Sequence, residues 1–251
     1  MFGPEGPRLR ELAVQALSSV ERGYDLLAPK FDHTPFRTPD PVLESVARAL
    51  APLGPFTDGL DLCCGTGAGT RMLTGLCQGS VTGVDFSAGM LDVARRRVTA
   101  PAGGPGLAWV RGDARALPFT AAFDLVVSFG AFGHFLPREL PGLFGQVHSV
   151  LRPGGRFAFP VLAPPRPWHP ASWMLLGFDA VMRVRNALWR PPFVMYYRTF
   201  RLGDVCRELT RAGFTVELRA LPGFGAPAQV GPPAPLRVGS ARPPPAGTIK
   251  T

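Results

Sequence analysis

The chain has 251 residues, of which 46% are hydrophobic and 18% charged, a composition that suits one α/β domain with or without an appended cap. The net charge of +9 is uneven: residues 160–251 carry 12 basic and 4 acidic side chains, which is typical either of an anionic partner or of a solvated basic surface. Transmembrane and secreted classes are not expected, since no apolar run reaches about 20 residues and no signal-peptide pattern is present. Four cysteines without zinc-ligand spacing indicate reduced thiols in the cytoplasm.

Residues 1–54 are predicted to form an N-terminal helical cap. Its helices are expected over residues 8–20 and 40–52, and the second has Asp40 as a candidate N-cap before Pro41. The aromatic, turn-rich segment 22–37 between them is predicted either to close over a ligand as a lid or to pack as an ordinary structural segment.

Residues 55–242 alternate between short apolar runs and amphipathic stretches, which predicts βαβ units and a doubly wound, mostly parallel sheet. Strands are expected at 58–63, 81–85, 107–110, 123–128, 156–159, 214–218 and 236–240. Helices are expected at 68–78, 87–99, 138–151 and 203–213. An insertion over 164–200 contains a predicted amphipathic helix at 171–190, and the tail 243–251 is expected to be mobile.

A glycine-rich turn follows the first predicted strand, at Gly65, Gly67 and Gly69. Glycines permit positive φ and let the backbone approach a ligand, so a strand, such a turn and a helix in succession favour a nucleotide-like cofactor. A dinucleotide fingerprint would place its third glycine at Thr70, and a P-loop would need a lysine that this turn lacks. Asp61, just before the turn, would repel a pyrophosphate and suit an amino-bearing ligand.

Five segments then appear in an informative order: LDLCCGTGAGT, GVDFSAGMLDVA, RGDARALPF, FDLVVSFGAFGHF and LRPGGRF. Together they resemble the core motifs of class I S-adenosylmethionine-dependent methyltransferases, in particular the small-molecule branch of the ubiquinone/menaquinone-biosynthesis type. The resemblance covers about residues 57–160. It implies a Rossmann-like sheet of seven strands, S-adenosylmethionine as cofactor and methyl transfer by direct displacement.

The resemblance also implies roles for the residues around the glycine-rich turn. Gly65 and Gly67 would let the backbone approach the methionine part of the cofactor, and Asp61 would bind its ammonium group. Asp85 would accept hydrogen bonds from both ribose hydroxyls, because a carboxylate accepts at two oxygens. Asp61 as a loop cap and Asp85 as a helix cap are the structural alternatives. The chain departs from the family at Cys63, where glycine is usual, and we expect the small side chain to be tolerated.

The same resemblance implies that Phe86 and Met90 line the adenine ring of the cofactor. Asp113 would accept from the adenine amino group, and the backbone N–H of Ala114 would contact a ring nitrogen. The alternative for Asp113 is a cap on the turn after the third strand.

At the reacting end, the resemblance places Ser128 and Gly130 beside the methyl group. In the lid segment, Tyr24 and Phe31 are expected to contact the cofactor. Phe129, Phe132 and Phe135 suit an apolar reaction pocket. His134 follows the fourth strand and is the candidate general base, with a purely structural histidine as the alternative.

The acceptor is predicted to be a small, largely apolar molecule that can carry an anionic group, bound beside the tryptophan- and arginine-bearing insertion. The helix at 171–190 could instead lie on a membrane surface or pack into the core. Nucleic acid is not favoured as a partner, since Phe129-Gly130-Ala131-Phe132 stands where a proline-flanked acceptor tetrad would be expected. The remaining alternatives are a non-catalytic S-adenosylmethionine-binding protein and a nicotinamide-dependent oxidoreductase.

Overall fold

The computed structural model describes residues 5–161 apart from 9, 12, 13, 15–17 and 35, then eight helical positions between 173 and 188, and residues 202–221 and 237–242. Most of the predicted insertion 164–200 and all of the predicted tail 243–251 lie outside the described residues. Within that description, no helix has the length and apolar character needed to cross a membrane.

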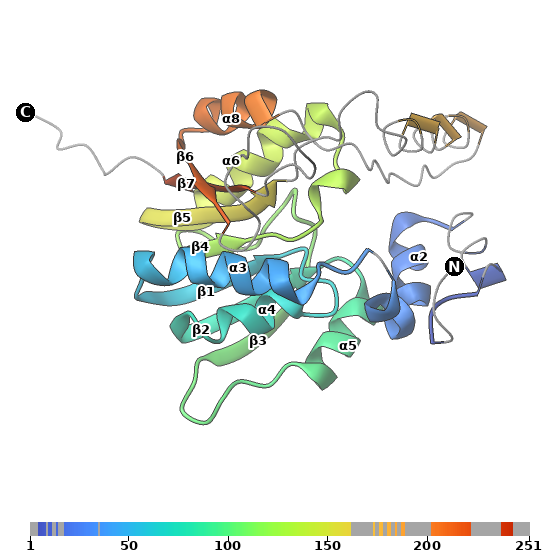
Figure 1. Cartoon of the computed structure of the whole chain (residues 1–251), viewed down its shortest axis with the longest axis horizontal. Helices are drawn as coiled ribbons and strands as arrows, with labels where there is room; N and C mark the ends of the chain where they lie inside the picture. Colours follow the sequence, from blue (N-terminus) through green and yellow to red (C-terminus); the bar gives the residue numbers. More distant parts are fainter. Residues whose placement is uncertain are drawn as a thin grey trace, which may run out of the picture.

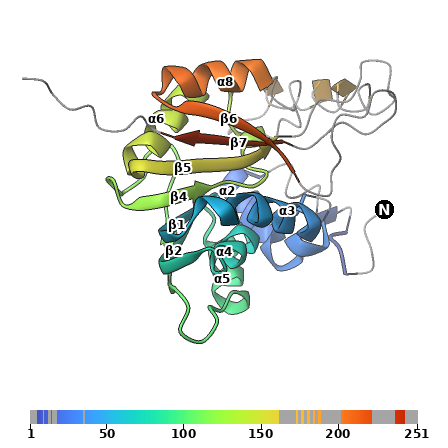
Figure 2. The same cartoon turned by 60° about the vertical axis from the view of Figure 1, so that its left-hand side comes forward.

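The described strands form one sheet in the order β3-β2-β1-β4-β5-β7-β6. The first five strands are parallel to their neighbours, whereas β7 runs antiparallel between β5 and β6 (Figure 2). The strands are β1 Phe56–Leu62, β2 Cys77–Asp85, β3 Gly106–Arg111, β4 Phe123–Val127, β5 Leu151–Val161, β6 Thr215–Ala220 and β7 Arg237–Arg242. The expected α/β architecture is therefore confirmed in its five parallel strands.

Helices cover both faces of this sheet (Figure 1). The described α-helices are α2 Val20–Leu27, α3 Asp40–Leu50, α4 Ala68–Leu73, α5 Ala88–Arg97, α6 Leu140–Val150 and α8 Leu202–Arg211. Short 3-10 helices are η1 Ala28–His33, η2 Ala51–Leu53, η3 Phe132–His134 and η4 Pro137–Glu139.

Several boundaries differ from the sequence-based expectations. The N-cap of α3 is Pro39 rather than Asp40, and the Asp40 carboxylate instead accepts from Arg37 and Arg71. The helix expected over 68–78 ends at Leu73, because β2 begins already at Cys77. The segment 22–37, expected to be turn-rich, contains most of α2.

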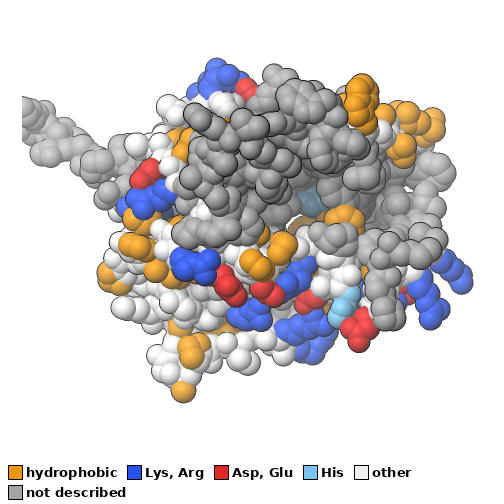
Figure 3. Space-filling view, in the orientation of Figure 1, with side chains coloured by type: hydrophobic (Ala, Val, Ile, Leu, Met, Phe, Trp, Pro, Cys, Tyr) orange, Lys and Arg blue, Asp and Glu red, His pale blue; other side chains and the backbone are white. Residues whose placement is uncertain are grey.

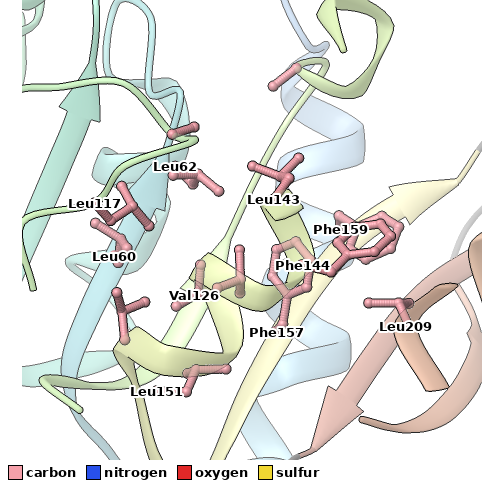
Figure 4. Close-up of a cluster of buried hydrophobic side chains, with 14 of the residues drawn as sticks. Leu60, Leu62, Leu117, Val126, Leu143, Phe144, Leu151, Phe157, Phe159 and Leu209 are labelled. Carbon is pink, nitrogen blue, oxygen red and sulfur yellow. The ribbon is translucent and has the colours of Figure 1, made fainter. Parts of the chain in front are cut away.

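The two sheet faces carry separate hydrophobic clusters, since neighbouring strand residues point to opposite sides. On β4, Val126 packs into the cluster beneath α6 and α8, whereas Leu125 and Val127 pack into the cluster beneath α3 and α4. Figure 4 shows the first cluster, where Phe157 and Phe159 meet Phe144 of α6. Strands buried on both faces explain why the sequence shows apolar runs rather than strict alternation.

The strand order reverses between β1 and β4, the point at which open α/β sheets bind ligands beyond the carboxyl ends of their strands. The chain leaves β1 into the glycine-rich turn and leaves β4 toward Ser128. The Ser128 hydroxyl donates to the carbonyl oxygen of Leu62 at 2.9 Å, which holds these two strand ends together. The fold thus brings two distant segments to one crevice.

Candidate functional site

The glycine-rich turn has a left-handed backbone at three positions: Cys63 (φ 58°), Gly65 (φ 52°) and Gly67 (φ 87°). Glycine adopts this conformation freely, whereas a side chain there is strained. A Cβ on Gly67 would lie 2.6 Å from Val98 of the segment after α5, so this glycine also permits close packing. Cys63, where the family pattern has glycine, adopts the strained conformation and packs against the hydrophobic cluster of β1 and α6.

Asp61 lies beneath this turn with only 1% of its surface exposed. The Thr70 hydroxyl donates to its Oδ2 at 2.8 Å, and burial raises the pKa of the carboxyl to about 7. Gly69 covers the carboxylate so closely that a Cβ would come within 2.7 Å of both oxygens. A buried acid that ionises with difficulty is stabilised by a cationic partner, so Asp61 fits the ammonium group of an amino-acid ligand.

Asp85 ends β2 and is 6% exposed. Its Oδ2 accepts from the backbone N–H of Gly65 at 2.8 Å and its Oδ1 accepts from that of Ser87 at 2.9 Å. Burial outweighs these hydrogen bonds and raises the pKa of the carboxyl to about 6. A carboxylate offers about four lone-pair positions, so Asp85 retains acceptor capacity for a pair of hydroxyl groups.

The helix-capping alternative for Asp85 is weakened by the residues that cap α5. Ser87 is the N-cap of α5, and its hydroxyl oxygen accepts from the N–H of Met90. Asp25 of α2 adds a second cap, since its Oδ1 accepts from the Ser87 hydroxyl at 2.5 Å and from the N–H of Gly89 at 2.9 Å. Asp85 bonds both the N–H of this N-cap residue, Ser87, and that of Gly65, and so joins the strand end to the glycine-rich turn.

Aromatic side chains from the cap gather beside Asp85. The ring of Tyr24 lies edge-on to Phe86 and Phe31, with centroid distances of 6.2 and 6.3 Å. Met90 is 1% exposed and packs under Tyr24 and Phe31 in a small cluster with Ala28. The structure therefore brings Phe86, Met90 and Tyr24 together, with Met90 on the buried side of the group.

Asp113 follows β3 and is engaged by Arg115. Both carboxylate oxygens accept from the Arg115 guanidinium at 2.8–3.0 Å, and Oδ1 also accepts from the Arg115 N–H. These contacts match the turn-capping alternative. Ala114, the neighbouring position, is buried.

The segment after β4 carries the remaining candidates. Gly130 has φ 70°, and Phe129 borders Gly69 so closely that a Cβ there would lie 2.7 Å from its ring. The ring of Phe132 packs 4.7 Å from that of Phe159 and belongs to the core rather than to an open pocket. His134 is half-buried, and its Nε2 lies 2.8 Å from the hydroxyl oxygen of Tyr24.

Residues that the sequence analysis missed tie the cap to the glycine-rich turn. The Thr66 hydroxyl donates to Asp32 of η1 at 2.6 Å, and Asp32 also pairs with Arg97 of α5. Phe31, which was expected from the sequence to contact the cofactor, lies 4.0 Å from a Cβ placed on Gly65. Such contacts span more than 30 residues of sequence, and the sequence carries no local pattern that would reveal them.

Comparisons with known proteins agree with this geometry. Residues 60–155 match the family model described as a methyltransferase domain. The chain is 33% identical over 126 residues to a 2-phytyl-1,4-naphtoquinone methyltransferase of Thermosynechococcus vestitus, covering 46% of this chain and 54% of that protein. It is 35% identical over 133 residues to a ubiquinone/menaquinone biosynthesis C-methyltransferase of Roseobacter denitrificans, covering 51% of this chain and 52% of the relative.

The chain spans about half the length of these two relatives. Among solved structures it is similar to magnesium protoporphyrin IX methyltransferase from Synechocystis PCC 6803 with bound S-adenosylhomocysteine. That likeness has a TM-score of 0.56 at 18% identity and covers 80% of this chain and 81% of the other. At this identity it supports the fold.

Proposed function

The chain belongs to the class I S-adenosylmethionine-dependent methyltransferases, with S-adenosylmethionine as their cofactor, and on that premise we propose that it methylates a small apolar acceptor of the quinone type. The observation that carries this proposal is the pair of buried carboxylates, Asp61 and Asp85, on either side of the glycine-rich turn. One suits the cofactor's ammonium group and the other suits its ribose hydroxyls.

The rest of the proposed cofactor site follows from the positions of the side chains. Gly65 leaves room beside the backbone, and Gly67 supplies the left-handed conformation and close packing that shape the turn. Phe86 and Tyr24 offer aromatic surface for the adenine ring. Asp113 contributes an acceptor only if the adenine amino group replaces some of its contacts with Arg115. When bound, the cofactor supplies an electrophilic methyl group on a positively charged sulfur. The protein's task is then to align the acceptor and to exclude water.

The N-terminal residues 20–33 are proposed as a lid over this site. Asp25 caps α5, Asp32 accepts from Thr66 of the glycine-rich turn, and Phe31 approaches Gly65. These contacts hold α2 and η1 across the strand ends where the cofactor would bind. In this arrangement His134 is the proposed general base on the acceptor side.

The acceptor class is supported by the two relatives, one named for a phytyl naphthoquinone and the other for ubiquinone/menaquinone biosynthesis, and by exposed apolar side chains in the insertion. Described helical positions in that insertion expose large apolar side chains, seen at the upper right of Figure 3. They are Trp173, Leu176, Val181, Val184 and Leu188, with 52–75% of their surfaces exposed. Amphipathic helices of basic, apolar character bind membrane surfaces, where quinones also reside, so peripheral membrane contact through 171–190 is part of the proposal.

Calorimetry and product release test this function in order. Titration with S-adenosylmethionine should give saturable binding, whereas NADH should give none. Release of S-adenosylhomocysteine is then measured with 2-phytyl-1,4-naphthoquinone in its reduced dihydroxy form, with tRNA and duplex DNA as comparison acceptors. Turnover on the quinol alone supports the proposal. Cofactor binding without turnover on any acceptor points to a non-catalytic binding protein, and turnover on nucleic acid contradicts the proposed acceptor class.

A further inference from the structure

One hydrogen bond joins the lid to the segment after β4, between Tyr24 of α2 and His134 of η3. Their Oη and Nε2 atoms lie 2.8 Å apart although 110 residues separate them in the chain. The two rings are also in edge contact, at 5.3 Å between centroids and 89° between planes. Both side chains are half-buried, so a ligand in the crevice can reach them.

The pair lies between the two halves of the proposed site. Tyr24 contacts Phe86, which follows the proposed ribose-binding acid Asp85, whereas His134 lies on the segment that follows β4. The strand order reverses between these halves, at the β1/β4 crevice. The pair thus joins the proposed adenine side of the site to the segment after β4, on which Ser128 and Gly130 are expected to border the methyl group.

We propose that Tyr24 is the residue that receives the acceptor's proton and that His134 stores it, so that the two act as one base. This inference rests on the proposed function. The O–H bond of the acceptor breaks, its proton binds to the Tyr24 oxygen, and the tyrosine's own proton passes to Nε2 of His134. Tyr24 stays neutral and His134 becomes positively charged. The electron pair left on the acceptor makes it the stronger nucleophile.

This assignment also couples the base to the lid. Tyr24 is positioned by α2, which Asp25 fastens to the first turn of α5. When α2 moves away, His134 loses its phenolic partner, and the base is incomplete until the lid closes. Proton removal is thereby restricted to the state in which the cofactor is covered.

Single and double variants of the full chain test the pair, with the reduced phytyl naphthoquinone as acceptor. Tyr24→Phe keeps the ring and removes only the hydroxyl; it should lower kcat roughly 100-fold, the usual size of a general-base contribution. His134→Gln should lower kcat by a similar factor, and the double variant should be no slower than the worse single one, because the residues act as a unit. The Kd for S-adenosylmethionine should change less than about threefold in Tyr24→Phe.

The control is Asp204→Asn on α8, outside the proposed site, which removes an exposed ion pair with Arg207 and should leave kcat unchanged. Multiplicative losses in the double variant, or a Tyr24→Phe enzyme within about twofold of the wild-type kcat, overturn the proposal.

A spectroscopic measurement needs no acceptor and so separates this inference from the proposed function. The ¹⁵N resonance of His134 Nε2, assigned with His134→Gln, should move toward that of a solvent-exposed imidazole in Tyr24→Phe and stay in place in Asp204→Asn. An unmoved resonance in Tyr24→Phe overturns the pair. If the resonance moves as expected while no quinol is methylated, the proposed acceptor has failed and the hydrogen-bonded pair is upheld.

Discussion

Gly69 lies directly over the carboxylate of Asp61, and a Cβ at position 69 would come within 2.7 Å of both carboxylate oxygens. The third glycine of the turn is therefore needed to make space for the carboxylate beneath it, and not for a pyrophosphate. The relationship explains why this chain needs a glycine at 69 although the third glycine of the dinucleotide fingerprint would fall at Thr70.

Gly69→Ala should displace the Asp61 carboxylate or the Phe129 ring and weaken cofactor binding. A contact under 3.0 Å cannot be accommodated without movement, so we expect the Kd for S-adenosylmethionine to rise roughly tenfold or more. Calorimetry measures the change. Gly75→Ala is the control, since its Cβ would meet only the Met72 carbonyl oxygen at 3.6 Å. Equal affinities in the two variants would contradict the assigned role.

Asp61 should make stability depend on pH. The pKa of this carboxyl is about 7 in the folded protein against 3.8 in the unfolded chain, so the folded state binds more protons between those values. Stability is consequently lost as pH rises from about 4 to about 7 and is constant above that range. Asp61→Asn should abolish this contribution, and urea unfolding of both proteins at pH 5 and pH 8 measures the difference.

The same ionisation should govern cofactor binding. A cationic ammonium group binds the ionised carboxylate, so the affinity for S-adenosylmethionine should increase from pH 6 to pH 8 in the wild type. Asp61→Asn should bind weakly at both pH values, whereas Asp92→Asn, an exposed acid paired with Arg95, should behave like the wild type. A wild-type affinity independent of pH would argue against direct contact between Asp61 and the ammonium group.

Cys63 should tolerate glycine and reject a β-branched residue. Its φ of 58° is strained for any side chain and most strained for valine, so Cys63→Val should cost about 2 kcal/mol of unfolding free energy. Cys63→Gly relieves the strain but loses packing, so its effect should stay within about 1 kcal/mol. Denaturant titration measures the free energy of unfolding of both variants. The control is Cys206→Val in α8, for which this free energy should change by less than about 1 kcal/mol.

Thr66→Val should loosen the lid, because it removes the hydroxyl that donates to Asp32 while keeping the volume of the side chain. Loss of this hydrogen bond costs about 1 kcal/mol, which should appear as faster amide exchange across residues 20–33. Thr74→Val is the control, since the Thr74 hydroxyl donates only locally, to the Arg71 carbonyl oxygen. Unchanged exchange in Thr66→Val would show that the contact does not hold the lid.

The exposed apolar side chains between 173 and 188 should bind lipid. The wild type should float with anionic phosphatidylglycerol vesicles, and a Val181→Glu/Leu188→Glu variant should stay at the bottom of the gradient. Leu218→Glu replaces an exposed apolar side chain on β6, outside the helical positions 173–188, and should still float. Flotation of all three proteins would move the lipid contact elsewhere on the molecule.

Much of the fold, and the residues proposed to bind the cofactor, could be predicted from local patterns in the sequence. The glycine-rich turn and the acid ending the second strand are short-range patterns. They appear in the structure as the left-handed turn and as the contacts of Asp85. The ends of strands were predicted less accurately. The second strand was expected at 81–85, but pairing with β1 extends β2 back to Cys77.

Contacts between residues far apart in the sequence could not be predicted from such local patterns. Tyr24 and His134 were each singled out, but as a cofactor contact and as a base, and nothing in either segment indicates their mutual hydrogen bond. The partner of Asp113, by contrast, is close in the sequence: Arg115, two positions later, donates hydrogen bonds to its carboxylate. The propensity of one segment does not report which distant partner will pack on it.

The Asp25 carboxylate accepts hydrogen bonds from both Ser87 and Gly89, and these bonds bear on where the domain begins. Family recognition begins at residue 60, yet the turn that presents Asp85 and Phe86 is completed by a carboxylate 35 residues upstream of that limit. A boundary drawn at residue 60 would therefore remove the carboxylate that completes this turn, and the N-terminal residues belong to the same structural unit as the strands.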